Sequence, residues 1–374
     1  MLAGMKKILS LLLLAMVASP LLAQVDVEHR RTFIAQTSAG IEGEEQLGGF
    51  GYYWYNQNGY PWTNTALRVI FAGVYLGGEL SYFLPANTNT AVGLGAGGGA
   101  YIDSVRTYLR GERLSGLCFD GDSVEAHVFV NHTIPNPTPL PLNLRATYTV
   151  SGSFYRNEEP GFVAPDDTLT QTLLAEFRFG GLEPGLTGIR GAELYIAADA
   201  NYRSGWNGFG PAGSLYASHS EYQHLLGSLA AKLPAGPTTI FGRLVGGAGH
   251  DLDQLSAWKL GGNLVGVESW SYPIHGYYTR EFLAEDFGLA NLELTIPLCK
   301  KRPIQGHLYA DWALLKQVPP MPRDWDNLIG VGAGVSFRAP WNVYVLLSYG
   351  YGINGVRNSD HGSHELALGL EKSF

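Results

Sequence analysis

The residues best suited to side-chain chemistry lie in the C-terminal third of the chain. His275 stands in the run Ile274-His275-Gly276-Tyr277, and two carboxylates, Glu293 and Asp311, follow it in segments where apolar and polar residues alternate. Two nearby carboxylates favour the protonated form of an imidazole, so we expect His275 to be held between Glu293 and Asp311. The alternative is that both carboxylates are ordinary polar residues of a channel lining.

Motifs for enzyme chemistry are weak by comparison. Ser218-His219-Ser220 lacks the Gly-x-Ser-x-Gly elbow of a hydrolase, and the glycine-rich run Gly93–Gly99 lacks the Gly-Lys-Ser/Thr of a phosphate-binding loop. The ten histidines show no paired spacing typical of metal ligands. We therefore expect no catalytic residues, no cofactor and no metal site, and we do not expect an enzyme.

The composition is unusual for a protein surrounded by water. Only 16% of the 374 residues are charged, against about 25% in soluble domains, and 49 residues are glycine. Aromatic residues make up 12% of the chain, which argues against disorder. The formal net charge of −8 also argues against a nucleic-acid partner.

The N-terminus resembles an export signal. Lys6 and Lys7 precede an apolar stretch, and Ala23 offers a small residue for cleavage. We expect residues 1–23 to be a signal peptide and residues 24–374 to form a single domain in the bacterial outer membrane. Cys118 and Cys299 are expected to stay unpaired, because the layout below puts them at opposite ends of the molecule.

The dominant pattern is a period of two. In Ile329–Phe337, for example, apolar residues alternate with glycine and serine, and the same alternation appears in Leu142–Phe154 and Glu365–Phe374. A β-sandwich would alternate as well, but it needs a charged exterior. An all-β fold, a transmembrane antiparallel β-barrel with its apolar face toward lipid, fits the low charge better.

Turn residues divide the chain into about sixteen candidate strands, an even number that would put both chain ends on the periplasmic side. The expected strands are residues 32–42, 47–56, 66–77, 90–102, 106–116, 123–134, 142–157, 168–180, 190–203, 222–234, 238–249, 285–298, 303–315, 328–338, 341–352 and 363–374. Short connections alternate with long ones, and the long ones are 204–221, 250–284, 316–327 and 353–362.

Segment 250–284 is the most unusual connection, because it is long and rich in aromatic residues. Aromatic loops rarely extend into water, and a barrel of this size would be an open hole without a plug. We expect this segment to fold into the lumen. The alternation places Glu293 and Asp311 on inward faces of two neighbouring strands, where they would hold its tip.

These features together resemble the barrel of the BamA/TamA surface-antigen superfamily. The resemblance covers about a third of the chain, from Lys259 to the terminal Phe374, and includes Leu260-Gly261-Gly262, the tip at 274–278, Leu292-Glu293, Ala310-Asp311 and the glycine alternation at 330–334. It implies a barrel of about sixteen strands, a sixth loop whose Arg-Gly-Phe/Tyr tip is held by acids on the twelfth and thirteenth strands, and an insertion signal in the last strand. On this chain the signal would be Leu366, Leu368, Leu370 and Phe374.

The sequence departs from the family in three places. His275 stands where the family has arginine, so the lock is expected to be weaker or pH-dependent. Lys372 replaces an apolar residue of the last strand. The few residues before the first strand leave no room for the family's periplasmic transport-associated domains, so we expect a barrel without them.

The resemblance implies a non-enzymatic role in outer-membrane protein insertion or polypeptide transport. A weak seam between the first and last strands would present an open edge to a client strand. The expected partners are outer-membrane lipids, unfolded outer-membrane protein clients, and a periplasmic chaperone or accessory protein. The alternative is a passive plugged channel or a structural barrel.

Overall fold

The computed structural model describes residues 25, 29–45, 48–101, 103–138, 140–156, 160–180, 191–216, 219–263, 271–299, 303–357 and 360–374. The expected signal peptide, residues 1–23, lies outside the described residues. No helix in the described ranges is long and apolar enough to cross a membrane.

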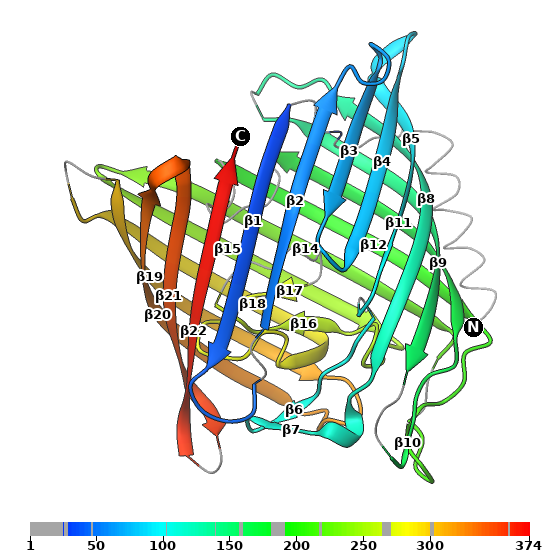
Figure 1. Ribbon diagram of the computed structural model, residues 1–374, viewed down its shortest axis with the longest axis vertical. Coiled ribbons are helices and arrows are strands. Elements are labelled where there is room, and N and C mark those ends of the chain that lie inside the picture. The colour runs from blue at the N-terminus through cyan, green and yellow to red at the C-terminus, as the bar shows by residue number, and fades with distance from the viewer. Residues whose placement is uncertain are drawn as a thin grey trace.

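Sixteen strands within the described residues form one closed antiparallel barrel, in which neighbours in the chain are neighbours in the sheet and β22 returns to pair with β1 (Figure 1). They are β1 (Arg30–Gly40), β2 (Gly48–Asn58), β3 (Thr65–Phe71), β4 (Tyr75–Leu84), β5 (Asn87–Gly99), β8 (Asp120–Ile134), β9 (Leu142–Arg156), β11 (Thr168–Gly180), β12 (Ala192–Ser204), β14 (Glu221–Ala235), β15 (Thr238–His250), β18 (Phe282–Pro297), β19 (Ile304–Gln317), β20 (Trp325–Ala339), β21 (Val343–Arg357) and β22 (Asp360–Ser373). The expected all-β barrel is confirmed, and a two-sheet sandwich is excluded.

The alternation along the strands separates an apolar exterior from a small and polar interior. On β22, Leu366 is 51% exposed, whereas its neighbours Glu365 and Ala367 are 0% and 6% exposed. On β18 and β19, Leu292 and Leu308 are each 52% exposed, while Asp311 is buried. Side chains that alternate along a strand point to opposite faces of the sheet, so the period of two in the sequence sorts these residues.

Two of the expected strands are wrong, and the errors cancel in the count. The expected strand 66–77 spans a turn at Gly73, whose φ of +71° suits glycine, and it is divided between β3 and β4. The expected strand 106–116 is not part of the barrel. It holds the small hairpin β6 (Tyr108–Leu109) and β7 (Glu112–Arg113) and the short 3₁₀ helix η1 (Ser115–Leu117). The turn Ala72-Gly73-Val74 contains no polar residue, so nothing in the sequence separates it from the strands on either side.

The expected long connection 353–362 is also wrong. β21 runs to Arg357 and β22 starts at Asp360, with a register shift between Gly352 and Val356. The irregular pairing interrupts the alternation, which hides the strand in the sequence.

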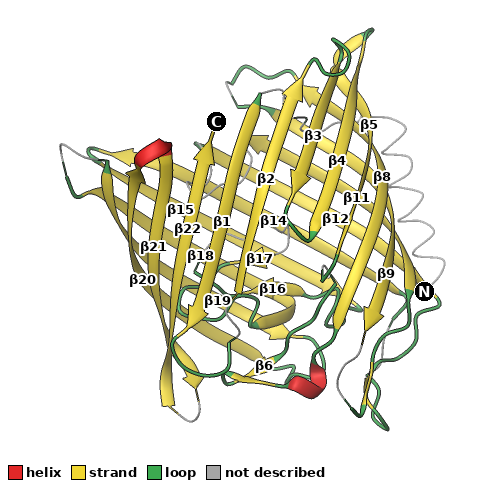
Figure 2. Ribbon diagram, viewed as in Figure 1, coloured by secondary structure: helices red, strands yellow, loops and turns green. Residues whose placement is uncertain are grey.

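The two ends of the barrel differ. The start of β1 and the end of β22 lie at the rim that also carries η2 (Pro340–Asn342), and we call this rim the turn end (Figure 2). The opposite rim, the loop end, carries the hairpin β6–β7 and the small sheet of β10 (Phe162–Val163) and β13 (Gly210–Pro211). β1 therefore runs from the turn end to the loop end, and β22 runs back from the loop end to the turn end.

The buried core lies inside the barrel, toward the loop end. Residues 251–263 and 271–281, which we call the lumen segment, supply much of it together with inward side chains of the strands. The segment includes β16 (Trp258–Leu260) and β17 (Ser271–Tyr272), which pair with each other, and β16 also pairs with β18. Trp258, Leu260, Ile274 and Tyr277 are at most 1% exposed. The lumen segment thus fills the barrel, as expected.

Candidate functional site

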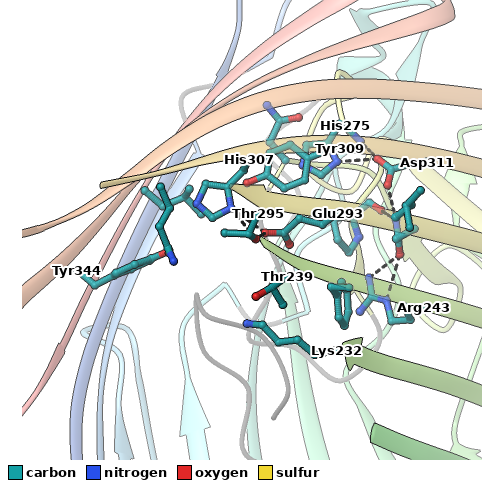
Figure 3. A pocket seen from close by; sticks show the side chains of 17 residues that line it. Lys232, Thr239, Arg243, His275, Glu293, Thr295, His307, Tyr309, Asp311 and Tyr344 are labelled. Carbon is teal, nitrogen blue, oxygen red and sulfur yellow. Dashed lines mark hydrogen bonds and ion pairs between the residues drawn. The ribbon is translucent and has the colours of Figure 1, made fainter. Parts of the chain in front are cut away.

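The tip of the lumen segment is held by Asp311 on β19. The Asp311 carboxylate lies 2.6 Å from His275 Nδ1 and accepts the backbone N–H of His275 at 2.7 Å, both through Oδ2 (Figure 3). Its other oxygen accepts a hydrogen bond from Asn291 Nδ2 at 2.7 Å. The side chains of His275 and Asp311 are only 8% and 1% exposed, so this pairing takes place away from water. The imidazole also stacks on Tyr309, with ring centroids 4.1 Å apart.

Glu293 does not hold the tip, contrary to expectation. Its Oε1 atom lies 2.8 Å from His307 Nδ1, and His307 Nε2 in turn lies 2.7 Å from Ser336 Oγ. The strand register explains the difference: Asn291 is opposite Asp311, whereas Glu293 is opposite Tyr309. Glu293 is therefore one inward position nearer the turn end, and the Tyr309 ring that stacks on His275 lies in that position.

Glycines on β20 and β21 allow the backbone of the tip to pack closely against these strands. Gly276 has a φ of +84°, and a Cβ atom there would overlap the backbone of Tyr351 and Gly352 on β21. Likewise, a Cβ atom on Gly330 would overlap the backbone of His275, and one on Gly350 would overlap the N–H of Gly276. The glycine alternation on β20 and β21 therefore serves close backbone approach, which offsets the usual cost of glycine in a strand.

The other tip residues are buried among partners on the last strands. Ile274 and Tyr277 are 0% exposed, and the Tyr277 hydroxyl lies 2.8 Å from Asn354 Oδ1. Gly276 N–H donates to Asn263 Oδ1 at 2.8 Å, and its carbonyl accepts the Ser363 hydroxyl of β22 at 2.5 Å. The tip thus contacts every strand from β19 to β22.

A buried ion pair lies at residues 278–281 of the lumen segment, which we call its base, and was not predicted. Arg357 on β21 donates two hydrogen bonds of 2.8 Å to the carboxylate of Glu281, and the two side chains are 3% and 5% exposed. The guanidinium also lies 4.1 Å from the centroid of the Tyr278 ring. Arg357 falls in a region that the sequence assigns to a loop, so no alternation marked it as inward.

A second unpredicted ion pair fastens the opposite side of the segment. Arg203 on β12 contacts Asp253 at 2.5 Å, and both side chains are buried. The guanidinium lies between the rings of Trp206 and Tyr222, at 4.3 Å and 4.2 Å from their centroids. A buried arginine and carboxylate far apart in the sequence give no local signal. Two walls of the barrel therefore hold the segment.

The seam between β1 and β22 is paired along its whole length. Nine residue pairs run from Thr32 opposite Ser373 to Gly40 opposite Glu365. The residues expected to form the C-terminal insertion signal lie on this strand or just after it: Leu366, Leu368 and Leu370 are opposite Ala39, Thr37 and Ala35, and Phe374 donates its N–H to the carbonyl of Arg31 at 2.9 Å. The junction of β2 with β3 is shorter, with six pairs.

A cavity of about 140 Å³ lies beside the tip. Its charged lining residues are Lys232, Arg243, Glu293 and Asp311, and Figure 3 shows them converging from β14, β15, β18 and β19. No group of three or more His, Cys, Asp or Glu within the described ranges is arranged to hold a metal ion. Cys118 and Cys299 are both free, as expected.

The fold and the buried segment define a plugged barrel of sixteen strands. Solved structures with this fold include BamA from Haemophilus ducreyi lacking POTRA domains 1–3, with a TM-score of 0.60 and 12% identity over 92% of this chain and 71% of that chain. CdiB from Acinetobacter baumannii has a TM-score of 0.57 and 13% identity over 94% of this chain and 61% of that chain. CdiB from Escherichia coli has a TM-score of 0.55 and 14% identity over 91% of this chain and 63% of that chain.

The predicted resemblance to BamA/TamA-like barrels is therefore confirmed at the level of the fold. The chain spans less than two thirds of the length of either CdiB chain. No protein-family model and no curated protein matches the sequence.

Proposed function

We propose that the protein is a non-enzymatic outer-membrane barrel that acts in outer-membrane protein insertion or polypeptide transport through its β1–β22 seam. The observation that carries this proposal is the combination of a BamA-like barrel with a lumen segment whose tip contacts β22 and whose base contacts β1 and β22, the two strands of that seam. No turn joins β1 to β22, so these two strands can separate further than the two strands of a hairpin.

The exterior of the barrel supports a place in the bacterial outer membrane. Large apolar side chains from strands all around the barrel are 48–59% exposed, which would be costly in water but suits contact with lipid. They include Val124, Val128, Leu225, Leu229, Leu244, Leu292, Leu308, Trp312, Leu347 and Leu366. A signal peptide at residues 1–23 would direct export of the chain across the inner membrane.

The proposed mechanism is strand exchange at the seam. Opening β1 from β22 exposes unpaired N–H and C=O groups, and a client strand pairs with them by β-augmentation. Each backbone hydrogen bond contributes about 0.5–1.5 kcal/mol net, so a seam of nine pairs does not open without competition. The client must therefore replace the seam pairs progressively instead of entering an edge that is already free.

The proposed partners follow from this mechanism. Outer-membrane lipids surround the exterior, and unfolded outer-membrane proteins are the clients. A periplasmic chaperone or accessory protein delivers them to the turn end, where β1 begins and β22 ends.

A reversible lock on the seam tests the function. In cells depleted of the native protein, we expect a variant with Ala35→Cys and Leu370→Cys, which face each other across the seam, to restore the outer-membrane proteome only when the disulfide is reduced. The matched control is Tyr148→Cys with Leu173→Cys, which locks β9 to β11 away from the seam and should restore it in both states. An outer-membrane proteome that is unchanged on depletion would refute the role.

The second candidate function is a passive plugged channel. The fully paired seam and the cavity beside the tip favour it, because neither requires strand exchange. Large, stable, ion-selective openings in planar bilayers that persist in the locked variant would support the channel, whereas small irregular openings that the lock abolishes would support the seam.

A further inference from the structure

The base of the lumen segment joins the two strands of the seam at the loop end. The Thr279 hydroxyl lies 2.9 Å from Ser38 Oγ on β1 and 3.5 Å from Glu365 Oε1 on β22. Ser38 and Glu365 lie near the last register pair of the seam, Gly40 opposite Glu365. One side chain of the lumen segment therefore contacts both sides of the seam.

Further contacts tie the same region together on each side. On the β22 side, Asn263 Nδ2 donates to the carbonyl of Glu365 at 2.9 Å. On the β1 side, Glu45 in the β1–β2 connection accepts the N–H of Thr279 at 3.1 Å, and the Tyr278 hydroxyl donates to the carbonyl of Glu42. The lumen segment and the seam strands thus form one hydrogen-bonded unit.

The unit contains more buried carboxylates than cations. Glu365 is 0% exposed and Glu281 is 6% exposed, and the Arg357 guanidinium already makes two hydrogen bonds to Glu281. The Oε2 atoms of Glu45 and Glu365 are buried without a hydrogen-bond partner in the described chain. Burial of a carboxylate oxygen without a hydrogen-bond partner disfavours the charged form of the group.

The charged and titratable groups around the unit come from five elements. They are Glu42, Glu44 and Glu45 of the β1–β2 connection, Tyr278, Arg280 and Glu281 of the lumen segment, Arg357 of β21, His364 and Glu365 of β22, and Tyr108 and Arg113 of the β6–β7 hairpin. His364 lies 3.7 Å from Glu42, and the backbone N–H of Arg113 donates to Glu44.

We propose that Thr279, Glu45 and Glu365 form a proton-dependent latch that holds the loop end of the seam closed. The latch regulates the seam of the proposed function and rests on it in that respect. With protons on Glu45 and Glu365, Thr279 bridges β1 and β22. Loss of those protons places like charges on Glu45 and Glu365 at the loop end of the seam, and the bridge breaks.

The direction of the pH response follows from Glu45, which lies in the β1–β2 connection. Burial raises the pKa of Glu45 to about 7, and this outweighs the opposite effect of the Thr279 N–H, which donates to Oε1, and of the nearby Gly40 N–H. An acid whose pKa is raised in the folded state stabilises that state below its ordinary pKa and loses this contribution as the pH rises through the raised value. The latch is therefore closed in mild acid and weakened above neutral pH.

Spin-label distances across the seam test the latch in the purified full-length protein in lipid vesicles, without any client. One label pair replaces Ala39 and Leu366 at the loop end, and a second replaces Phe33 and Lys372 at the turn end. Cys299→Ser removes the more exposed native thiol, whereas Cys118 is 3% exposed. Between about pH 6 and about pH 9, we expect the loop-end distances to lengthen and broaden more than the turn-end distances.

The variants separate the latch from other effects of pH. Glu365→Gln and Glu45→Gln cannot ionise, and each should reduce the loop-end response, whereas Thr279→Val should give broad loop-end distances already in mild acid. Glu371→Gln, which removes a carboxylate of β22 near the turn end, is the matched control and should respond as the native protein does. If one glutamine variant fails to fold, the other still gives the comparison.

Two results would overturn the latch: loop-end distances that do not change with pH, or an equal change in the native protein and both glutamine variants. Neither result bears on the seam-lock experiment in cells, which tests the proposed function by itself. A locked seam that still restores the proteome would refute the function and leave the pH response of the latch intact.

Discussion

Asp311 combines a side-chain and a backbone contact with His275, at 2.6 Å and 2.7 Å, both through one carboxylate oxygen. A carboxylate that accepts two hydrogen bonds through one oxygen fixes both the position and the orientation of the ring. An arginine in this place would offer five donors in a planar fork, whereas the imidazole contacts Asp311 through one ring nitrogen. The tip of this protein is therefore held by fewer side-chain hydrogen bonds than an arginine could make.

Replacement of Asp311 by asparagine should loosen the lumen segment. The variant keeps the shape but loses the negative charge opposite His275, at a cost of about 1–3 kcal/mol. We expect limited proteolysis from outside the cell to cleave residues 250–281 faster than in the native protein.

Glu293→Gln is the matched control for that variant. It removes an inward carboxylate on the neighbouring strand whose partner is His307 and not the tip. Cleavage of the segment should stay at the native rate. Equal acceleration in both variants would mean that general lumen polarity, and not the Asp311 contact, protects the segment.

The lumen segment is fastened to the barrel at residues that no local pattern connects. Arg203 with Asp253 and Arg357 with Glu281 hold it at two walls, and the glycine row on β20 and β21 receives its tip. The element is therefore part of the core and not a loop attached at its two ends alone. Its removal would leave buried charges of both signs without partners.

Gly350→Ala should destabilise the barrel by disrupting the close packing of the tip against β21. A Cβ atom at residue 350 would overlap the N–H of Gly276 and Asn263 Oδ1, so the tip would have to shift. We expect a loss of about 1–3 kcal/mol, measured as a lower thermal unfolding temperature in detergent.

Gly242→Ala on β15 is the control for Gly350→Ala, because nothing lies within 4 Å of a Cβ atom at residue 242. It should be neutral, or stabilising by about 0.5–1 kcal/mol. Similar losses in both variants would show that the cost comes from the strand and not from the tip.

The sequence predicted part of this arrangement for physical reasons. Alternation in a strand has a fixed period, so the inward side of Asp311 and the outward side of Leu366 could be read directly. The offset between two strands is set by pairing across the sheet and is not visible in either strand alone. The alternation therefore predicts that Glu293 points inward, but not that it lies opposite Tyr309 instead of Asp311. Long-range partners such as Glu281 and Arg357 depend on the closed barrel and left no signal.

The described buried residues fill the barrel toward one end. The lumen segment and the hairpin β6–β7 occupy the loop end, whereas the cavity beside the tip is lined by residues that extend toward the turn end, such as Lys232 and Thr239. We therefore expect passage through the lumen to require the segment to move. The buried ion pair at its base is therefore the contact whose loss should affect permeability most.

Arg357→Met should make the barrel leakier. The substitution leaves the Glu281 carboxylate buried without its cation, which costs about 3–5 kcal/mol. We expect more frequent openings in planar bilayers. The double variant Arg357→Met with Glu281→Gln removes both charges and should recover part of the native closure, and failure of that recovery would argue against an electrostatic cause.

The pairing of Thr32 with Ser373 also governs how the molecule can be made. The first and last strands are separated by nearly the whole polypeptide, so the entropy lost in bringing them together is large and falls on a single late event. Until that event, the incomplete sheet has two unpaired edge strands that neighbouring chains can capture. We therefore expect a newly synthesised copy to need assistance before its barrel closes.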